Sequence, residues 1–509
     1  MTDTQKAIKS FGPPIVFISA FLALLLFLLG SISLNWRYVH DSPLMIYAGW
    51  LITQGSIPYL DFFDMNMPGT YFVSCLMGAL FGWKDLGFRI FDLLLLVNIS
   101  ASTFLWMRNF GKLPALTASV SFPLWYLIQG PEMSLQREYI ALLPFSWLLL
   151  VATSKNSRYH KARFFLAGMF TAATMLIKPH FLILCLPVLI VLIREKVDNY
   201  NAVYRSAILL SGLSLPFVAT LIYLYKFGAL KPFVDIVFNY LPLYAQMTGK
   251  HEAISGFQRH IYLLSSMAKG MINLWLVLGI SGLVTINRDH IPKYYLYLLG
   301  VLLTMATIYP VFSGQFWKYH WIPFYYVALC SGALSAGADF YAKSRWKSIV
   351  AYLAILALTF LLSFSAMNLI FRAWANDYKF SPPKAGVPDE ISEFLTANLK
   401  QGDTVQPLDW TGGAVHGMLQ AKAPLATRFM YDFHFYHHLS SPYIMSLRHE
   451  FVNSLSEKKP RFIVEILKNK PWPNGADASR EFSELRSFLH QNYIIAHSTI
   501  NYRIFSRKK

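Results

Sequence analysis

The chain has 509 residues, of which 55% are hydrophobic and only 14% are charged, and its mean hydropathy is +0.39. Several apolar runs reach about 18 residues or more, the length that a membrane-spanning helix needs. This composition excludes an ordinary soluble protein and predicts a polytopic α-helical membrane protein. The 40 Phe, 29 Tyr and 13 Trp residues fit aromatic belts at both membrane interfaces.

The net charge of +18 does not indicate nucleic-acid binding, because the basic residues lie in short loops between apolar runs. Loops of this kind are typical of the cytoplasmic side of a membrane protein. They cover residues 108–112, 155–163, 194–205, 288–293 and 343–347. The three cysteines, Cys75, Cys185 and Cys330, are far apart in sequence and indicate neither a disulfide framework nor a metal site.

The first apolar run, 13–34, is too long for a signal-peptide core and lacks a small-residue cleavage site, so we expect it to be a helix. With the basic loops as markers of the inside, the N-terminus lies inside and the C-terminus outside. About eleven spans are expected, near 13–34, 87–107, 113–128, 139–153, 164–177, 180–194, 206–225, 264–286, 295–312, 318–337 and 348–370.

The segment 67–82 is predicted to be a partly embedded helix of the outer surface. About sixteen residues reach roughly 24 Å, which is less than the ~30 Å hydrocarbon core. A full span here would also place the loop at 108–112 outside, against the charge pattern.

The composition divides the chain into a transmembrane domain, 1–370, and a tail, 371–509, that lies outside the membrane. The tail begins with Pro382, Pro383 and Pro388 and then alternates between helical and strand-like runs, which predicts a small α/β domain. Strands are expected at 404–408, 462–466, 493–497 and 502–505, and helices near 389–400, 440–457 and 478–490.

The outer loop, 35–86, follows the first span and mixes carboxylates with aromatic residues. Asp41, Asp61 and Asp64 stand among Tyr59 and other large rings. Such a surface suits a site for a polar group carried on a lipid, or an interfacial amphipathic helix that anchors the fold.

The same loop resembles that of a known family. An aspartate after the first span is followed by a helix, a glycine, Pro-Tyr, aspartates, a proline, a short helix ending in Phe-Gly, and an arginine. These are Asp41, Gly55, Pro58, Tyr59, Asp61, Asp64, Pro68, Phe81, Gly82 and Arg89. The pattern resembles the GT-C superfamily of glycosyltransferases, in particular bacterial members similar to protein O-mannosyltransferases (dolichyl-phosphate-mannose-protein mannosyltransferase-like) and the lipid A aminoarabinose transferase. The segments LIKPH at 176–180 and GQFWKYHWIPF at 314–324 also resemble segments of that family.

The resemblance implies an inverting glycosyltransferase that moves a sugar from a polyprenyl-phosphate donor to an acceptor hydroxyl at the outer face of the inner (plasma) membrane. Nucleotide sugars are cytoplasmic, so a transfer outside needs a donor that has already crossed the membrane. Asp41 is the expected base, because a nearby carboxylate can take the proton of an attacking hydroxyl. The alternative for Asp41 is a helix N-cap, since Asp-Ser-Pro opens a helix well.

The leaving lipid phosphate calls for cations near the outer face. The candidates are Lys178, Lys318, Arg137, His320 and Arg89. The aminoarabinose enzyme has a lysine before its proline pair, whereas this chain has Asn66-Met67-Pro68, so that lysine cannot be carried over. A snorkelling interface cation is the alternative for each candidate.

Glu138 on the next outer loop is the expected second acid, with an ion pair to Arg137 as its alternative. Asp61, Asp64 and Tyr59 are candidates for acceptor or sugar binding. No cofactor is predicted, because no ligand set for a metal stands out, although some superfamily members bind a divalent cation.

Two tail motifs are not assigned to ligands. The TGG at 411–413 lacks the full glycine fingerprint for phosphate binding, and the rings around His434, His437 and His438 favour an aromatic surface over a metal site.

The competing functions are a transporter or flippase for a lipid-linked or polar substrate, which predicts charged residues in mid-span and broken helices in both halves, and a non-catalytic receptor. The expected partners are the lipid-linked donor, membrane lipids and a glycan, lipid or protein acceptor. The sequence does not identify the sugar, the acceptor or the polyprenyl length.

Overall fold

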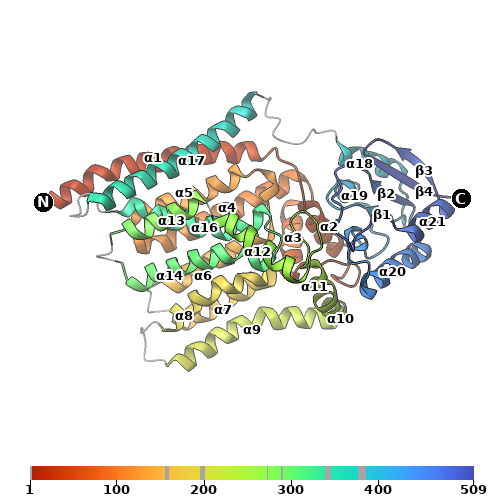
Figure 1. Ribbon diagram of the computed structural model, residues 1–509, viewed down its shortest axis with the longest axis horizontal. Coiled ribbons are helices and arrows are strands. Elements are labelled where there is room, and N and C mark those ends of the chain that lie inside the picture. Colours follow the sequence, from red (N-terminus) through yellow and green to blue (C-terminus); the bar gives the residue numbers. More distant parts are fainter. Residues whose placement is uncertain are drawn as a thin grey trace. The chain divides into compact units, whose positions relative to one another are not determined.

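A computed structural model describes residues 3–154, 160–194, 201–271, 273–287, 291–338, 345–375 and 386–508 (Figure 1). The predicted basic loops after residue 154 lie partly outside the described residues. Pro382 and Pro383 lie outside them as well. The chain forms two compact units. The first comprises Met1–Trp36, Arg89–Ala219 and Leu264–Phe380, and the second comprises Arg37–Phe88, Thr220–Leu263 and Ser381–Lys509.

The first unit is a bundle of apolar helices. Its elements are α1 (Asp3–Ser33), α4 (Asp85–Met107), α5 (Lys112–Ile128), α6 (Arg137–Thr153), α7 (His160–Ile177), α8 (Leu182–Arg194), α9 (Ala202–Lys226), α13 (Leu274–Thr285), α14 (Lys293–Ile308), α16 (Ile322–Ala333) and α17 (Arg345–Ala375). Helices α1 and α17 lie side by side, and α5 packs against both and against α16 (Figure 1). Large apolar side chains such as Phe17, Leu94 and Phe360 are exposed, as expected of a surface that faces lipid.

Every predicted span coincides with a helix of this bundle, but the number of spans is not confirmed. Among the described residues, five helical stretches are long and apolar enough to cross a membrane: Pro14–Ser33, Asp85–Phe110, Ala202–Lys226, Lys293–Ser313 and Arg345–Ala375. A sixth would be α12 (Gly256–Met271) together with α13. Helices α5 and α6 have 17 residues each, and α8 and α16 have 13 and 12. These helices are shorter than the ~20 residues of a regular span, which is why the prediction of eleven exceeds the structural count.

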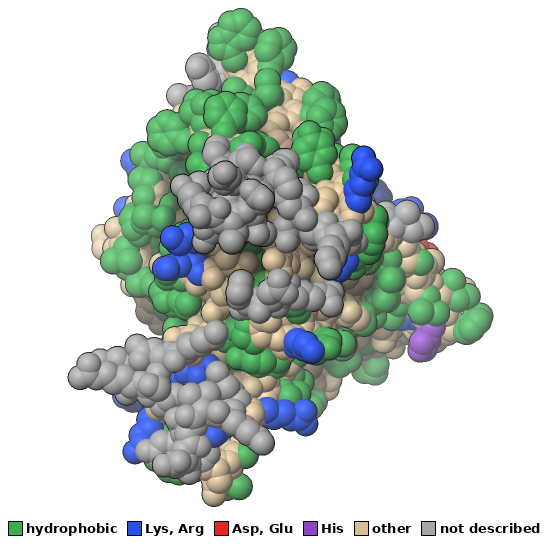
Figure 2. Space-filling model, turned by 90° about the vertical axis from the view of Figure 1, so that its left-hand side faces the viewer, with side chains coloured by type: hydrophobic (Ala, Val, Ile, Leu, Met, Phe, Trp, Pro, Cys, Tyr) green, Lys and Arg blue, Asp and Glu red, His purple; other side chains and the backbone are tan. Residues whose placement is uncertain are grey.

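Basic side chains gather at one end of the molecule. Figure 2 looks at the face where the N-terminus lies and shows Lys and Arg side chains over it, with hardly any Asp or Glu. This distribution agrees with the gathering of basic loops on one side that the sequence predicts. Which side of the membrane that end faces stays a prediction.

Glycines allow close approach between helices of the bundle. A Cβ on Gly212 of α9 would lie 2.0 Å from the carbonyl oxygen of Phe165 in α7. A Cβ on Gly168 of α7 would lie 2.1 Å from the carbonyl oxygen of Leu209. The two backbones therefore touch where neither helix carries a side chain, a common way for helices to associate in lipid.

The second unit combines the outer loop, the segment 220–263 and the tail. Its helices are α2 (Ser42–Thr53), α3 (Pro68–Phe81), α10 (Leu230–Asp235), α11 (Leu241–Tyr244), α18 (Val387–Asn398), α19 (Ala414–Gln420), α20 (Pro442–Lys458) and α21 (Ser483–Asn492). The 14 residues of α3 agree with the short helix predicted at 67–82. Whether α3 is embedded, and whether 1–370 and 371–509 act as separate domains, stay predictions.

A small mixed sheet lies in the tail. Its strands are β1 (Val405–Leu408), β2 (Phe462–Ile466), β3 (Tyr493–Ser498) and β4 (Tyr502–Arg507), in the order β1-β2-β4-β3. β1 and β2 pair in parallel, and β4 pairs antiparallel with β2 and β3. The four strands confirm the predicted strand positions, whereas α19 was not predicted. In the turn before α19, the Asp409 carboxylate accepts hydrogen bonds from the amides of Gly412 and Ala414, so the TGG turn is closed by the protein itself.

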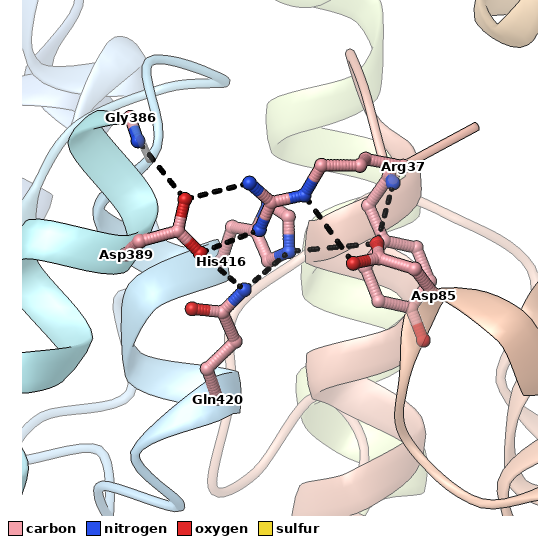
Figure 3. A network of polar contacts seen from close by, with 7 residues as sticks. Arg37, Asp85, Gly386, Asp389, His416 and Gln420 are labelled. Atoms are coloured by element: carbon pink, nitrogen blue, oxygen red, sulfur yellow. Dashed lines mark hydrogen bonds and ion pairs between the residues drawn. The ribbon is translucent and has the colours of Figure 1, made fainter. Parts of the chain in front are cut away.

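An ionic network joins the outer loop to the tail within the second unit (Figure 3). The Arg37 guanidinium donates to both oxygens of Asp389 at 2.6 and 2.8 Å, and its Nε lies 3.3 Å from Asp85. The His416 Nε2 lies 3.7 Å from the Asp85 Oδ1. Gln420 donates to Asp389 at 3.4 Å. Residues separated by more than 300 positions are thus held by a bidentate, charge-assisted contact.

His416 makes the stability of the second unit depend on pH. Burial lowers the pKa of His416 to about 4, although Asp85 opposes this shift. Between pH ~6.5 and about 4 the unfolded chain therefore binds a proton that the folded chain does not, so stability falls as the pH falls. We expect His416→Gln to flatten this decline in thermal unfolding of the purified protein between pH 7 and pH 4. Exposed His490→Gln is the control and keeps the wild-type slope; an unchanged slope in His416→Gln contradicts the prediction.

The contact between α7 and α9 gives a second prediction. Gly212→Ala forces the two helices apart and lowers the free energy of unfolding by about 1–3 kcal/mol, seen as a lower melting temperature in detergent. Gly300→Ala in α14 is the matched control, because a Cβ there meets no atom within 4 Å. Equal melting temperatures for the two variants would contradict the proposed close contact.

Candidate functional site

Three candidates from separate loops meet in the first unit. Glu138 lies in the first turn of α6, Lys178 follows the last turn of α7, and His320 lies in a short 3₁₀ helix, Lys318–Trp321, that leads into α16. The Lys178 Nζ lies 2.9 Å from Glu138 Oε1, and His320 Nε2 lies 3.8 Å from the same oxygen. The helix dipole favours this placement, since it stabilises a carboxylate near a helix N-terminus and an ammonium group near a C-terminus.

The structure gives Glu138 a partner that the sequence did not indicate, Lys178. The adjacent Arg137 donates to the Tyr319 hydroxyl at 3.2 Å and lies 5.5 Å from that ring, and its ion pair with Glu138 stays a prediction. Lys318 is different from the other cations: its side chain is 78% exposed and lies 3.9 Å from Glu132. Lys178 and Arg137 are therefore the cations of the buried cluster, and Lys318 belongs to the surface.

Some polar atoms of this cluster are not satisfied by the described residues. Glu138 is fully buried, and its Oε2 has no hydrogen-bond partner there. The Nδ1 atoms of His320 and His180 also lack one. A buried polar atom left without a partner costs about 1–3 kcal/mol, so such atoms indicate a place for a polar ligand or water. We name Arg137, Glu138, Lys178, His180 and His320 the buried ionic cluster.

Two of the three loops that carry the cluster contain a bulky residue in the left-handed backbone region. Leu135 has φ of 49° before α6, and Phe316 has φ of 59° before the 3₁₀ helix of His320. Such conformations cost about 1–3 kcal/mol each and persist only where surrounding contacts enforce them. Strain of this kind is typical of functional sites, and here it occurs in the loops before Glu138 and before His320.

Arg89 lies apart from these contacts. Its side chain is fully buried, pairs with Asp92 at 3.3 Å, donates to the Ser134 hydroxyl and stands over the Trp36 ring. Asp92 also accepts a hydrogen bond from Tyr126 at 2.6 Å. These contacts neutralise the guanidinium inside the protein and favour a structural role, although its predicted phosphate contact has not been tested.

Asp41 belongs to the second unit and occupies the N-cap position of α2. Its side chain makes no capping hydrogen bond, and the residue is 9% exposed. Asp41 thus has the N-cap position of the alternative, without the hydrogen bond from a cap side chain to the amides of α2. His40, directly before it, has φ of 56°, and the Asp41 charge acts on His251, opposing the lowering of the His251 pKa by burial.

The other two aspartates of the outer loop have different surroundings. Asp64 is 1% exposed and accepts hydrogen bonds from Met65, Asn66, Tyr71 and Tyr431, so its oxygens are occupied by the protein. The Asp61 side chain is exposed, accepts one bond from the Ile57 amide and lines a cavity.

Tyr59 is buried with φ of 69°, and its hydroxyl donates to the carbonyl oxygen of Asn66 at 2.7 Å. Among Tyr59, Asp61 and Asp64, the Asp61 side chain is the one open to a ligand. The roles of all three in sugar binding stay predictions.

The sequence did not single out His180, Tyr319 or the pair of Arg89 with Asp92 as partners in the site. His180 stands in the predicted hairpin LIKPH and Tyr319 in the segment 314–324, so both lie in motifs that drew attention for a neighbouring lysine. Their contacts depend on how distant helix ends meet, which a single sequence does not reveal.

The histidines of the tail pack among rings. His434 lies 4.9 Å from Phe63 and 4.4 Å from Tyr431 between ring centroids, and His437 lies 5.2 Å from Phe433. Among the described residues, no group of three metal-ligating side chains lies close enough to hold an ion. The aromatic surroundings predicted for this motif are present.

The chain shares its fold with two solved structures. ArnT from Cupriavidus metallidurans, bound to undecaprenyl phosphate, is 12% identical, with a TM-score of 0.54 over 97% of each chain. The arabinofuranosyltransferase AftD from Mycobacteria is also 12% identical, with a TM-score of 0.50 over 97% of this chain and 40% of AftD. No protein-family model and no curated protein sequence matches the chain. The fold shared with these two proteins agrees with the family resemblance seen in the sequence.

The pair of Lys178 with Glu138 gives a testable prediction. Lys178→Met leaves a buried carboxylate without its ammonium partner and lowers the free energy of unfolding by about 3–5 kcal/mol, whereas adding Glu138→Gln recovers most of this loss. Thermal unfolding in detergent measures both. Lys318→Met serves as the control and leaves the melting temperature unchanged, since that amine is exposed. No recovery in the double variant contradicts the pairing.

Proposed function

We propose that this protein is a membrane glycosyltransferase that moves a sugar from a polyprenyl-phosphate donor to an acceptor hydroxyl, with inversion at the anomeric carbon. The observation that carries the proposal is the buried ionic cluster: two cations, two histidines and one carboxylate at helix ends, with polar atoms left for a ligand. The shared fold with ArnT, whose structure holds undecaprenyl phosphate, supports the same donor class. The transporter alternative is not favoured by this fold.

The cations of the cluster suit a lipid phosphate. As the bond between sugar and phosphate breaks, negative charge grows on the phosphate oxygens, and fixed cations in a water-poor site stabilise that charge. Lys178 and Arg137 supply the charges, and His320 offers a ring nitrogen, Nδ1, for which the described residues provide no hydrogen-bond partner. Lys318 is a weaker candidate because water screens its exposed ammonium.

Glu138 positions the lysine of the cluster. With its Oε1 at 2.9 Å from the Lys178 Nζ, the carboxylate fixes one direction of the ammonium and leaves its other protons for an anion. The carboxylate also balances part of the cluster charge while no phosphate is bound.

Asp41 is proposed as the catalytic base. In the transfer, the acceptor oxygen forms a bond to the anomeric carbon, the carbon–oxygen bond to the phosphate breaks with its electron pair, and the hydroxyl proton passes to the Asp41 carboxylate. A single displacement of this kind inverts the anomeric centre. The place of Asp41 directly after the first span, at the start of α2, is the position at which the family that the outer loop resembles carries its base.

We place this reaction at the outer face of the membrane, with the N-terminus cytoplasmic and the second unit in the periplasmic or extracellular space. The gathering of basic side chains at one end supports this orientation. The acceptor belongs to the cell envelope, as a glycan, lipid or protein hydroxyl.

Transfer by purified, reconstituted protein tests the proposal. With a panel of labelled polyprenyl-phosphate sugars, we expect sugar transfer or donor hydrolysis by the wild type and a loss of about 100-fold or more in Asp41→Asn. Asp403→Asn, a surface carboxylate in the same unit, keeps the wild-type rate. A folded Asp41→Asn variant with full activity moves the base to another residue. A wild type that uses no donor of the panel contradicts the function.

A further inference from the structure

The second unit contains a cavity of about 850 Å³ that the proposed chemistry does not use. It lies where the end of α2, the loop that carries Asp61, Trp83, the irregular segment 422–428 and helix α20 meet. Its volume is in the range of about 300–1,000 Å³ that small-molecule sites occupy. The cavity is therefore large enough for several sugar rings.

Aromatic faces form part of its wall. Trp83 is half-buried, and its indole packs so closely on Gly78 that a Cβ there would lie 2.0 Å from the ring. Trp50 is buried and stacks on Tyr47 with 5.5 Å between centroids. The two indoles are therefore fixed before a ligand arrives. Rigid indoles suit the flat C–H faces of sugar rings, because they offer apolar area at little entropy cost.

Hydrogen-bonding groups form another part of the wall. Asp61 keeps one oxygen for a ligand, since its Oδ2 accepts the Ile57 amide. Arg428 and Glu450 form a bidentate pair at 2.5 and 2.7 Å, which fixes both side chains at the cavity. A carboxylate acceptor and a guanidinium donor held in place can recognise vicinal hydroxyl groups.

Two lysines give the cavity an excess of positive charge. Lys422 and Lys458 line it, and within the described part of the chain neither has an ion-pair partner, whereas Arg428 is balanced by Glu450. With Asp61 as the remaining carboxylate, the lining carries three positive and two negative side chains. An anionic substituent on the ligand is therefore favoured over a neutral or cationic one.

We propose that this cavity binds an acidic saccharide: Trp83 and Trp50 pack on sugar rings, Asp61 and Arg428 hold hydroxyl groups, and Lys422 with Lys458 bind a phosphate or carboxylate substituent. The site deepens the proposed function by naming the acceptor class as an acidic glycan, and to that extent it rests on that function. The binding itself does not require the transfer reaction.

Calorimetric titration of the purified full-length protein tests the site with three tetrasaccharides: maltotetraose, a phosphorylated maltotetraose and tetragalacturonic acid. We expect the acidic probes to bind at least about tenfold more tightly than the neutral one, and Lys422→Ala/Lys458→Ala to remove that difference. The two acidic probes distinguish phosphate from carboxylate recognition. Inorganic phosphate alone binds weakly, because the rings supply part of the affinity.

Two further variants keep the test independent of stability. Ser454→Trp fills the cavity from α20 without removing a contact partner and abolishes binding of every saccharide. Lys400→Ala/Lys468→Ala, a pair of exposed lysines in the same unit outside the cavity, binds as the wild type does. Binding that survives Ser454→Trp, or a wild type that binds no probe, overturns the site.

Donor hydrolysis without acceptor separates the site from the proposed function. The cavity variants keep wild-type donor hydrolysis, and Asp41→Asn keeps saccharide binding. If the wild type binds the acidic saccharides but does not hydrolyse the donor, the transferase function is rejected and the cavity site is retained. Intact hydrolysis with no binding rejects the cavity site alone.

Discussion

Each ionisable group inside the apolar bundle has to meet an opposite charge or pay a large desolvation penalty. Glu138 meets Lys178 at 2.9 Å, and Arg89 meets Asp92 at 3.3 Å. The pair of Glu138 with Lys178 joins the start of α6 to the end of α7, so a shift of one helix turn would leave a buried charge without its partner. Arg89 and Asp92 are neighbours one turn apart in α4. The first unit thus gains a fixed arrangement of helix ends, and that arrangement brings the ligand candidates of three loops together.

Charged and polar groups of the second unit also need partners, and they find them in hydrogen bonds as well as in an ion pair. Asp64 accepts bonds from its own loop and from Tyr431 in the tail, while Arg37 binds Asp389 in α18. The Tyr47 hydroxyl donates to the carbonyl oxygen of Ala423. These contacts convert a loop, which in isolation has too little apolar area to fold, into one wall of a compact unit. Ala423 lies between Lys422 and Pro424, so its contact with Tyr47 holds one side of the cavity that we assign to an acidic saccharide.

Much of the fold could be predicted from the sequence, because hydrophobic length and turn residues are local signals. The run at 462–466 and the helix at 442–458 were expected close to where they occur. The short α19 was missed, since seven residues opened by a glycine turn carry too weak a period to stand out. The count of spans is not confirmed, because apolar helices such as α16, with 12 residues, are shorter than a regular span.

The site was predictable in its residue types but not in its pairing. Lys178, Glu138 and His320 were each candidates from charge and position alone, and their meeting depends on helix packing over a separation of as many as 182 residues. Asp64 shows the opposite case: an aspartate among aromatics looks like a ligand group in sequence, yet its oxygens are used within the protein. Local sequence does not distinguish a carboxylate that is available to bind a ligand from one whose hydrogen bonds stabilise a loop.

The second unit is built from three stretches of chain that are widely separated in sequence, and this affects how the protein is made. Arg37 and Asp389 are 352 residues apart, and Tyr47 and Ala423 are 376 apart. The outer loop leaves the ribosome long before the tail is made, so its contacts with the tail can form only late in synthesis. The final assembly of this unit therefore closes loops of several hundred residues. A chain interrupted before α18 would keep the partners of the outer loop in the segment 220–263, such as Phe233 beside Tyr59 and Tyr240 beside Phe63, but would lack those in the tail.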